Sequence, residues 1–188
     1  MSFDISTFKA GGLQQGGARP ALFDVQLTFP AGVALDATTS PRLQLTCRAS
    51  QLPAATVGSI DVGYFGRMIK VAGDRTFTDW NITVMNDEDF VVRAAFEKWS
   101  NSINNLQSNI RDINVSLESY KAEAIITQYG KTGFKIRQYR MVGAFPTAVD
   151  AIDLNWETQN QVETFGVTFA YDYWLPELEF KNSYKAVT

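Results

Sequence analysis

The chain has 188 residues, 45% of them hydrophobic and 20% charged, which is typical of one folded domain rather than a disordered segment. Its net charge of −3 at pH 7 argues against a basic surface that holds nucleic acid. The chain has no histidine, which is the commonest general base and metal ligand. Its single cysteine, Cys47, excludes an intramolecular disulfide and a zinc site built from thiolates.

The N-terminal residues 1–19 contain two glycine pairs around a polar stretch, and we expect them to form a flexible arm. The sequence has no apolar core of signal-peptide length at its start and no apolar run of about 20 residues. We therefore expect a protein that is made and kept in the cytosol, unless it leaves as part of a larger particle.

The first strand is predicted at residues 21–29, where apolar and polar side chains alternate. Residues 30–41, bounded by proline at both ends, predict a loop. A second strand is predicted at residues 42–49, with Leu43, Leu45 and Cys47 facing inward. We expect Cys47 to be a buried, inert thiol, because no histidine is present to activate it.

The segment 71–90 predicts a strand, a turn at Gly73 and Asp74, and a second strand over residues 76–85. In that second strand Trp80, Ile82 and Val84 are predicted to face the core. The turn is a candidate contact between subunits, and its candidate residues are Gly73, Asp74 and Arg75.

One helix is predicted at about residues 87–103, where apolar side chains recur at four-three-four spacing: Val92, Phe96, Trp99 and Ile103. Asn86 or Asp87 is the expected N-cap, and acids in the first turn are favoured by the helix dipole. A metal cluster at residues 87–89 is an alternative, but the spacing of a calcium loop is missing and capping is preferred. The asparagine-rich residues 104–118 predict mostly loop.

Four further strands are predicted at residues 120–129, 134–145, 151–157 and 162–174. A glycine-bounded turn at 130–133 joins the first two into a hairpin, and residues 158–160 are expected to join the last two. The last strand places a set of alternating apolar side chains on one face: Phe165, Val167, Phe169, Tyr171 and Tyr173.

The predicted fold class is therefore mainly β, an antiparallel barrel or sandwich with one α-helix. No catalytic constellation and no cofactor motif can be recognised, so we expect neither an enzyme nor a bound cofactor or metal. We expect an arm at residues 1–19, a β domain at residues 20–174 and a C-terminal extension at residues 175–188.

Three ordered stretches of the chain are distinctive: ARPALFDVQL near the N-terminus, RMIKVAGDRTFTDWNITVMNDEDF followed by RAAFEKW, and FPTAVDAIDLNWETQNQVETFGVTFAYDYW near the C-terminus. In this order they resemble the tail tube protein family of T4-type bacteriophages. The resemblance covers residues 18–174. The glycine-rich N-terminus, residues 30–41 and the segment after Trp174 depart from the family pattern.

The resemblance implies a non-enzymatic virion protein that is made in the bacterial cytoplasm. Subunits of this family form hexameric rings, and the rings stack into a hollow tail tube whose inner wall is a continuous β-barrel. The implied partners are further copies of the chain, the tail sheath, the baseplate or tube initiator and the tail terminator. The tape-measure protein and DNA occupy the lumen transiently, without stable nucleic-acid binding.

A lumen that passes DNA should be neutral or acidic, because basic side chains attract phosphate. Two polar faces are therefore candidates for the lumen wall: Thr164, Thr168 and Asp172, or Asp153, Asn155 and Glu157. Contacts between stacked rings are expected from residues 49–75 and the N-terminal arm.

Other readings remain open from the sequence. Within the recognised class, the chain could be a tube-initiating baseplate protein or the tube of a phage-like contractile injection system. A small β-rich carbohydrate-binding module would also be acidic and aromatic-rich, and it would bind sugar as a monomer. A β-barrel enzyme is disfavoured by the absence of histidine.

Overall fold

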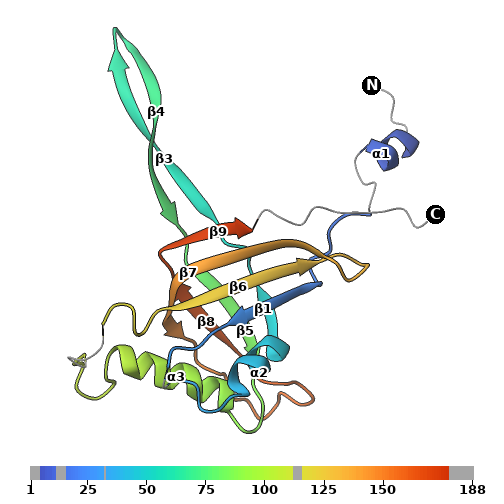
Figure 1. Ribbon diagram of the computed structural model, residues 1–188, viewed down its shortest axis with the longest axis vertical. Helices are drawn as coiled ribbons and strands as arrows, with labels where there is room; N and C mark the ends of the chain where they lie inside the picture. The colour runs from blue at the N-terminus through green and yellow to red at the C-terminus, as the bar shows by residue number, and fades with distance from the viewer. Residues whose placement is uncertain (1–4, 12–15, 32, 112–115, 178–188) are drawn as a thin grey trace.

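The computed structural model describes residues 5–11, 16–31, 33–111 and 116–177 (Figure 1). In that part of the chain the helices are α1 (Ile5–Gly11), α2 (Thr39–Thr46) and α3 (Val91–Ile103). The strands are β1 (Phe23–Leu27), β2 (Cys47–Ser50), β3 (Ala55–Tyr64), β4 (Arg67–Phe77), β5 (Trp80–Met85), β6 (Ala122–Tyr129), β7 (Lys135–Val149), β8 (Thr164–Ala170) and β9 (Tyr173–Glu177).

The long strand β7 belongs to two layers and joins them. Its first part pairs with β6 and β9, and its last part pairs with β8. The strand order is β1-β6-β7-β8-β5-β2, and all the pairs are antiparallel. Gly143 lies between the two parts with φ of 72°, a value that favours glycine. The predicted class, mainly β with antiparallel strands, is confirmed, but the described structure has three helices where one was predicted.

The core lies between these two layers and α3, and large aromatic side chains dominate it. The rings of Phe96 and Trp99 on α3 meet Phe169 on β8 at centroid distances of 5.9 and 6.1 Å. Trp99 is fully buried, and its indole Nε1–H donates to the carbonyl of Tyr120 at 2.8 Å. The predicted inward faces of β1, β5 and β8 are confirmed by the burial of these residues: Val25, Leu27, Trp80, Ile82, Val84, Phe165, Val167 and Phe169.

Helix α3 carries the predicted apolar stripe, but it begins later than predicted. Phe90, with φ of 54°, occupies the N-cap position and the first helical residue is Val91. The acids at 87–89 lie in the preceding turn, where the Asp89 carboxylate accepts the Val91 backbone N–H at 3.2 Å. Aspartate side chains that bond nearby backbone amides favour such turns over a helix interior.

The strand predicted at residues 42–49 is wrong for its first five residues, which belong to α2. Leu43 is fully buried, whereas Leu45 is 81% exposed. Leu43 and Cys47 are four residues apart, a spacing that fits one helix face as well as it fits one strand face. Pro41 lies in the first turn of α2, where its missing N–H breaks no helical hydrogen bond.

The turn predicted at Gly73 and Asp74 is also wrong. Both residues lie inside β4, and the chain reverses at Phe65 and Gly66, which have φ values of 42° and 78°. Positive φ at both central residues is the geometry of a two-residue hairpin turn. The pairing register shifts next to Gly73, so its glycine marks a β-bulge rather than a reversal.

The strand predicted at residues 151–157 does not form, and neither does its hairpin with the last strand. Residues 150–163 connect β7 to β8 without regular structure, and Trp156 is 99% exposed. The neighbours of β8 are β5 and the end of β7, so no place beside it remains for another strand. The glycine turn between β6 and β7 is confirmed, with the Gly130 N–H donating to the Phe134 carbonyl at 2.8 Å.

Replacing Trp99 by alanine should lower the free energy of unfolding by about 3–5 kcal/mol, because it leaves a cavity and an unpaired carbonyl. Chemical denaturation measures the change. Trp156→Ala is the matched control, because its side chain is exposed, and it should shift stability by less than about 0.5 kcal/mol. Equal effects of the two substitutions would contradict the core described above.

Candidate assembly surfaces

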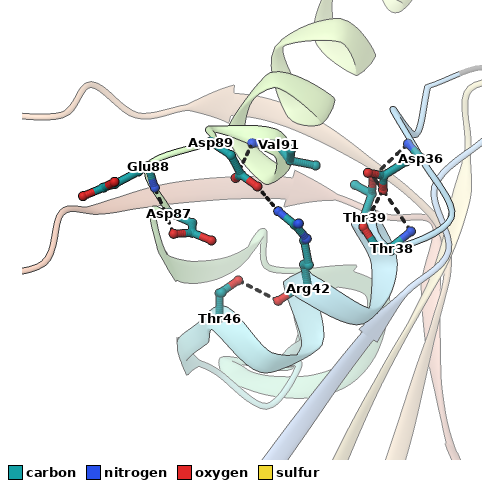
Figure 2. A network of polar contacts seen from close by, with 9 residues as sticks. All are labelled: Asp36, Thr38, Thr39, Arg42, Thr46, Asp87, Glu88, Asp89 and Val91. Atoms are coloured by element: carbon teal, nitrogen blue, oxygen red, sulfur yellow. Dashed lines mark hydrogen bonds and ion pairs between the residues drawn. The ribbon is translucent and has the colours of Figure 1, made fainter.

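The acids before α3 take part in a network of hydrogen bonds and an ion pair. In the described part of the chain, no group of three or more Asp, Glu, His or Cys residues is placed to hold a metal ion. The Asp87 carboxylate accepts the Glu88 backbone N–H at 2.9 Å, and the Asp89 carboxylate pairs with Arg42 on α2 (Figure 2). Among the described helices, none has the length and apolarity needed to cross a membrane.

A second aspartate in this network holds the start of α2. The Asp36 carboxylate accepts hydrogen bonds from the Thr38 backbone N–H at 2.9 Å and from the Thr39 hydroxyl at 3.1 Å (Figure 2). The side-chain hydrogen bond from Thr38 lowers the pKa of Asp36. The hydrogen bond from Arg42 lowers the pKa of Asp89. Together these contacts fasten α2 to the turn that precedes α3.

The lowered pKa of Asp89 predicts a pH dependence of stability. The ionised carboxylate contributes stability above its ordinary value of 3.8, and this contribution is lost as the pH falls through the lower pKa of the folded state. Asp89→Asn should therefore flatten the decline of the melting temperature below about pH 4. Arg42→Gln should do the same, and the double variant should add little to either. Unchanged acid melting curves would contradict a folded-state ion pair.

Cys47 is half-buried at the start of β2. Burial raises the pKa of its thiol to about 12, with a further contribution from the nearby Asp24 carboxylate. The thiol is therefore protonated at neutral pH, which agrees with the expected inert cysteine.

Thiol reagents test this directly. At pH 8 the native protein should react with a maleimide far more slowly than the urea-unfolded chain, because only the thiolate attacks. Mass spectrometry of timed samples gives both rates. Equal rates would show that Cys47 is accessible and ionised in the fold.

The hairpin of β3 and β4 projects away from the rest of the structure as a two-stranded sheet of its own (Figure 1). Its base is held by the ring of Phe77 at 6.0 Å from Tyr171, whose hydroxyl donates to the Ala54 carbonyl at 3.4 Å. The register places one set of apolar side chains on the same face of the ribbon: Ile60, Val62, Tyr64, Ile69 and Val71. All five are exposed, and Phe65 at the tip is 91% exposed.

The three candidate contact residues Gly73, Asp74 and Arg75 lie together, within the bulged part of this hairpin. A Cβ on Gly73 would lie 3.3 Å from the Gly58 backbone and from the Ile60 side chain, so glycine lets the two strands approach. The sequence prediction therefore placed a turn at a glycine inside β4 and did not include the β3–β4 reversal at Phe65 and Gly66.

The candidate lumen residues do not form a single cluster. Thr164 and Thr168 project from the outer face of β8, and the Thr168 hydroxyl donates to the Asn81 side chain on β5 at 2.6 Å. Asp172 lies beyond the end of β8, and its carboxylate pairs with Lys121 at 2.6 Å.

The other candidate set, Asp153, Asn155 and Glu157, is exposed in the 150–163 loop rather than on a strand. There the Asn155 side chain accepts the Glu157 backbone N–H at 2.9 Å. The structure thus separates the two candidate faces that were predicted to lie in neighbouring strands of one hairpin.

The outer face of β5 and β8 has a composition of its own. Its outward positions include neither lysine nor arginine, and all but Met85 are polar or small: Asn81, Thr83, Met85, Thr164, Gly166, Thr168 and Ala170. The outer face of the layer formed by β1, β6, β7 and β9 differs, since it carries Arg140 within 4.0 Å of Glu123. The β5–β8 face is therefore the surface less attractive to phosphate.

Several strand edges are left without a strand partner in the described structure. β2 pairs with β5 alone, and the end of β7 pairs with β8 alone. β1 and β9 likewise have one strand neighbour each. Open edges of this kind present unpaired backbone groups and favour pairing with another chain.

Comparison with known proteins assigns the chain. The family model described as phage tail tube protein matches residues 18–177. The chain is 39% identical, over 158 residues, to the tail tube protein gp19 of Enterobacteria phage T4, covering 84% of this chain and 90% of that protein. The chain belongs to the phage tail tube protein family. These findings confirm a structural tail tube subunit rather than an enzyme.

Solved structures agree on the tail tube fold. The tube-terminating cap of the anti-feeding prophage matches with a TM-score of 0.62 at 14% identity, covering 87% of this chain and 92% of that chain. A chain of the sheath–tube complex of the PVC extracellular contractile injection system matches with a TM-score of 0.56 at 15% identity, covering 95% of this chain and 100% of that chain.

Two surfaces of this tail tube subunit were not predicted from the sequence: the exposed 150–163 loop and the β3–β4 hairpin. The alternation of Ile152, Leu154 and Trp156 predicts one face of a strand, whereas Trp156 is exposed in a loop. The strand β3 is not predicted over its full length, because the residues before Ile60 lack a clear period. The sequence signal for the tip of the hairpin was Gly66, which lies between the exposed Phe65 and Arg67.

Proposed function

We propose that this tail tube subunit forms hexameric rings that stack into a hollow tube for DNA ejection in a contractile phage tail. The observation that carries the proposal is the pair of open edges in the layer of β2, β5, β8 and the end of β7. A ring closes this layer on itself, so the edges that would be exposed in a monomer become paired.

The directions of the strands support this closure. β2 runs parallel to β8 and antiparallel to the end of β7, because each successive pair in the layer is antiparallel. Rotation about a ring axis keeps these directions. The β2 edge of one subunit would therefore meet the β7 edge of its neighbour in antiparallel pairing and extend the sheet without a break.

The outer face of this layer supports the lumen assignment. Of the two candidate sets, the threonines Thr164 and Thr168 lie on that face, with the Thr147 hydroxyl donating to the Thr168 carbonyl at 3.2 Å beside them. A wall of hydroxyl and amide groups without cations passes DNA without retaining it. The tape-measure protein and DNA would occupy this lumen transiently.

The remaining contacts involve other partners and the chain ends. The sheath surrounds the tube, with a baseplate initiator at one end and a terminator at the other; the similar fold in a sheath–tube complex supports such partners. The N-terminal arm of residues 1–19 would add contacts between rings through α1, where Ile5 and Phe8 are exposed. The predicted C-terminal extension, residues 175–188, lies outside the described residues except for 175–177, which belong to β9.

Electron microscopy of the purified chain at high concentration tests this function. Stacked rings or hollow tubes are expected, and a reconstruction should place Thr164 and Thr168 on the inner wall. A protein that stays monomeric at all concentrations and binds sugar would contradict the proposal. Tubes whose inner wall carries Glu123 and Arg140 would keep the tube but overturn the lumen assignment.

Introducing a cation at Thr168 tests the lumen wall chemically. Tubes of Thr168→Lys should retain short double-stranded DNA in low salt, and the retention should fall steeply as salt rises. Thr168→Gln is the matched control, similar in length but uncharged, and its tubes should retain as little DNA as the native tubes. Equal DNA retention by tubes of Thr168→Lys and of Thr168→Gln would contradict a lumen position for residue 168.

A further inference from the structure

The proposed stacking leaves open which surface of the next ring receives the β3–β4 hairpin. We propose that the apolar face of the hairpin docks on the 150–163 loop of a second copy of this chain in the adjoining ring, with Trp156 as the central anchor. This inference rests on the proposed function and adds the partner surface to it.

The hairpin cannot satisfy its own apolar face. A two-stranded hairpin is at best marginally stable in water, and this one leaves one face of five large side chains exposed beyond its anchored base. The opposite face differs, since it carries the ion pair of Lys70 with Asp61 at 3.0 Å. Only one face of the ribbon is therefore suited to an apolar partner.

The apolar face of the hairpin also carries one positive charge, that of Arg67. Arg67 pairs with Tyr64 across the strands and thus lies on the apolar face, near the tip. Among the described residues Arg67 forms no ion pair, and no acid shares its face over the paired positions 60–64 and 67–71. The partner surface should therefore be apolar at its centre and acidic at its rim.

The 150–163 loop has this chemistry. It exposes three large apolar side chains, Leu154, Trp156 and Val162. The loop contains four acids and neither lysine nor arginine: Asp150, Asp153, Glu157 and Glu163. Trp156 is exposed next to Glu157, and an exposed tryptophan is the type of residue that becomes a binding hot spot once it is covered. Its ring would also accept the guanidinium of Arg67.

The position of the two surfaces makes the contact intermolecular. The tip of the hairpin and the connection between β7 and β8 lie at opposite ends of the long axis of the molecule (Figure 1). They cannot meet within one subunit. A contact between two different surfaces at opposite ends repeats from copy to copy without closing, which is what a stack of rings requires.

The loop side is tested by Trp156→Ala in the full chain, with Gln161→Ala as the matched control in the same exposed loop. Sedimentation and electron microscopy then separate monomers, single rings and tubes. Trp156→Ala should raise the concentration needed for tubes by on the order of tenfold or more while rings persist. Gln161→Ala should assemble as the native chain does.

The hairpin side is tested by a pair of substitutions that differ only in the face they alter. Ile69→Asp, on the apolar face, should leave rings that do not stack. Met68→Asp, on the opposite face, should still form tubes, although Met68 is the more exposed of the two, at 70% against 51%. Equal effects of the two would overturn the choice of face.

A charge exchange tests the pairing itself. Arg67→Glu should weaken stacking, and a second substitution in the loop, Glu157→Arg or Asp153→Arg, should restore it. Native tubes in Trp156→Ala, or no rescue by Glu157→Arg or Asp153→Arg, would overturn the docking surface. Neither result would contradict the proposed tube. A native chain that forms neither rings nor tubes would instead refute the proposed function, so the two failures are distinguishable.

Discussion

A two-stranded ribbon that leaves an apolar face in water is the constraint on which this structure depends. The body of the subunit is self-sufficient, because β1, β5, β8 and α3 bury a continuous aromatic and aliphatic core. The β3–β4 hairpin is not, since its exposed apolar face and the open edges of the neighbouring layer have no partner in one subunit. The folded subunit is thus a stable core that carries unsatisfied surfaces, and assembly satisfies them.

This division explains why the acids and the cysteine have structural roles. Arg42 and Asp89 hold α2 against the turn before α3, and Cys47 is kept protonated by burial. These contacts fix the layer that starts at β2, and that layer supplies both an open edge and the cation-free face of Thr164 and Thr168. The rigidity of the core therefore determines where the edges and the polar face point in a ring.

Periodicity predicted the core-facing strands and the long helix, and it failed at the short helix α2 and in the 150–163 loop. The two-residue period of β5 and β8 and the helical stripe of α3 identified real elements, because burial selects those side chains. Leu154 and Trp156 show the same alternation yet are exposed in a loop, and the interface proposed above would account for their large apolar side chains. Leu43 and Cys47 fit both a helix and a strand, and the sequence alone could not decide between them. Of the candidate site, the polar face with Thr164 and Thr168 was predictable, whereas the β3–β4 hairpin, with its reversal at Phe65, and the exposed 150–163 loop required three dimensions.

Hydrogen exchange of the hairpin amides, measured before and after assembly, tests the central claim most directly. In the dispersed subunit, the amides of β3 and β4 beyond their anchored base should exchange much faster than those of β5 and β8, because two strands with an uncovered apolar face open readily. In tubes, the hairpin amides should become as protected as those of the core. Hairpin amides already protected in the dispersed subunit, or still exchanging fast in the tube, would contradict the account.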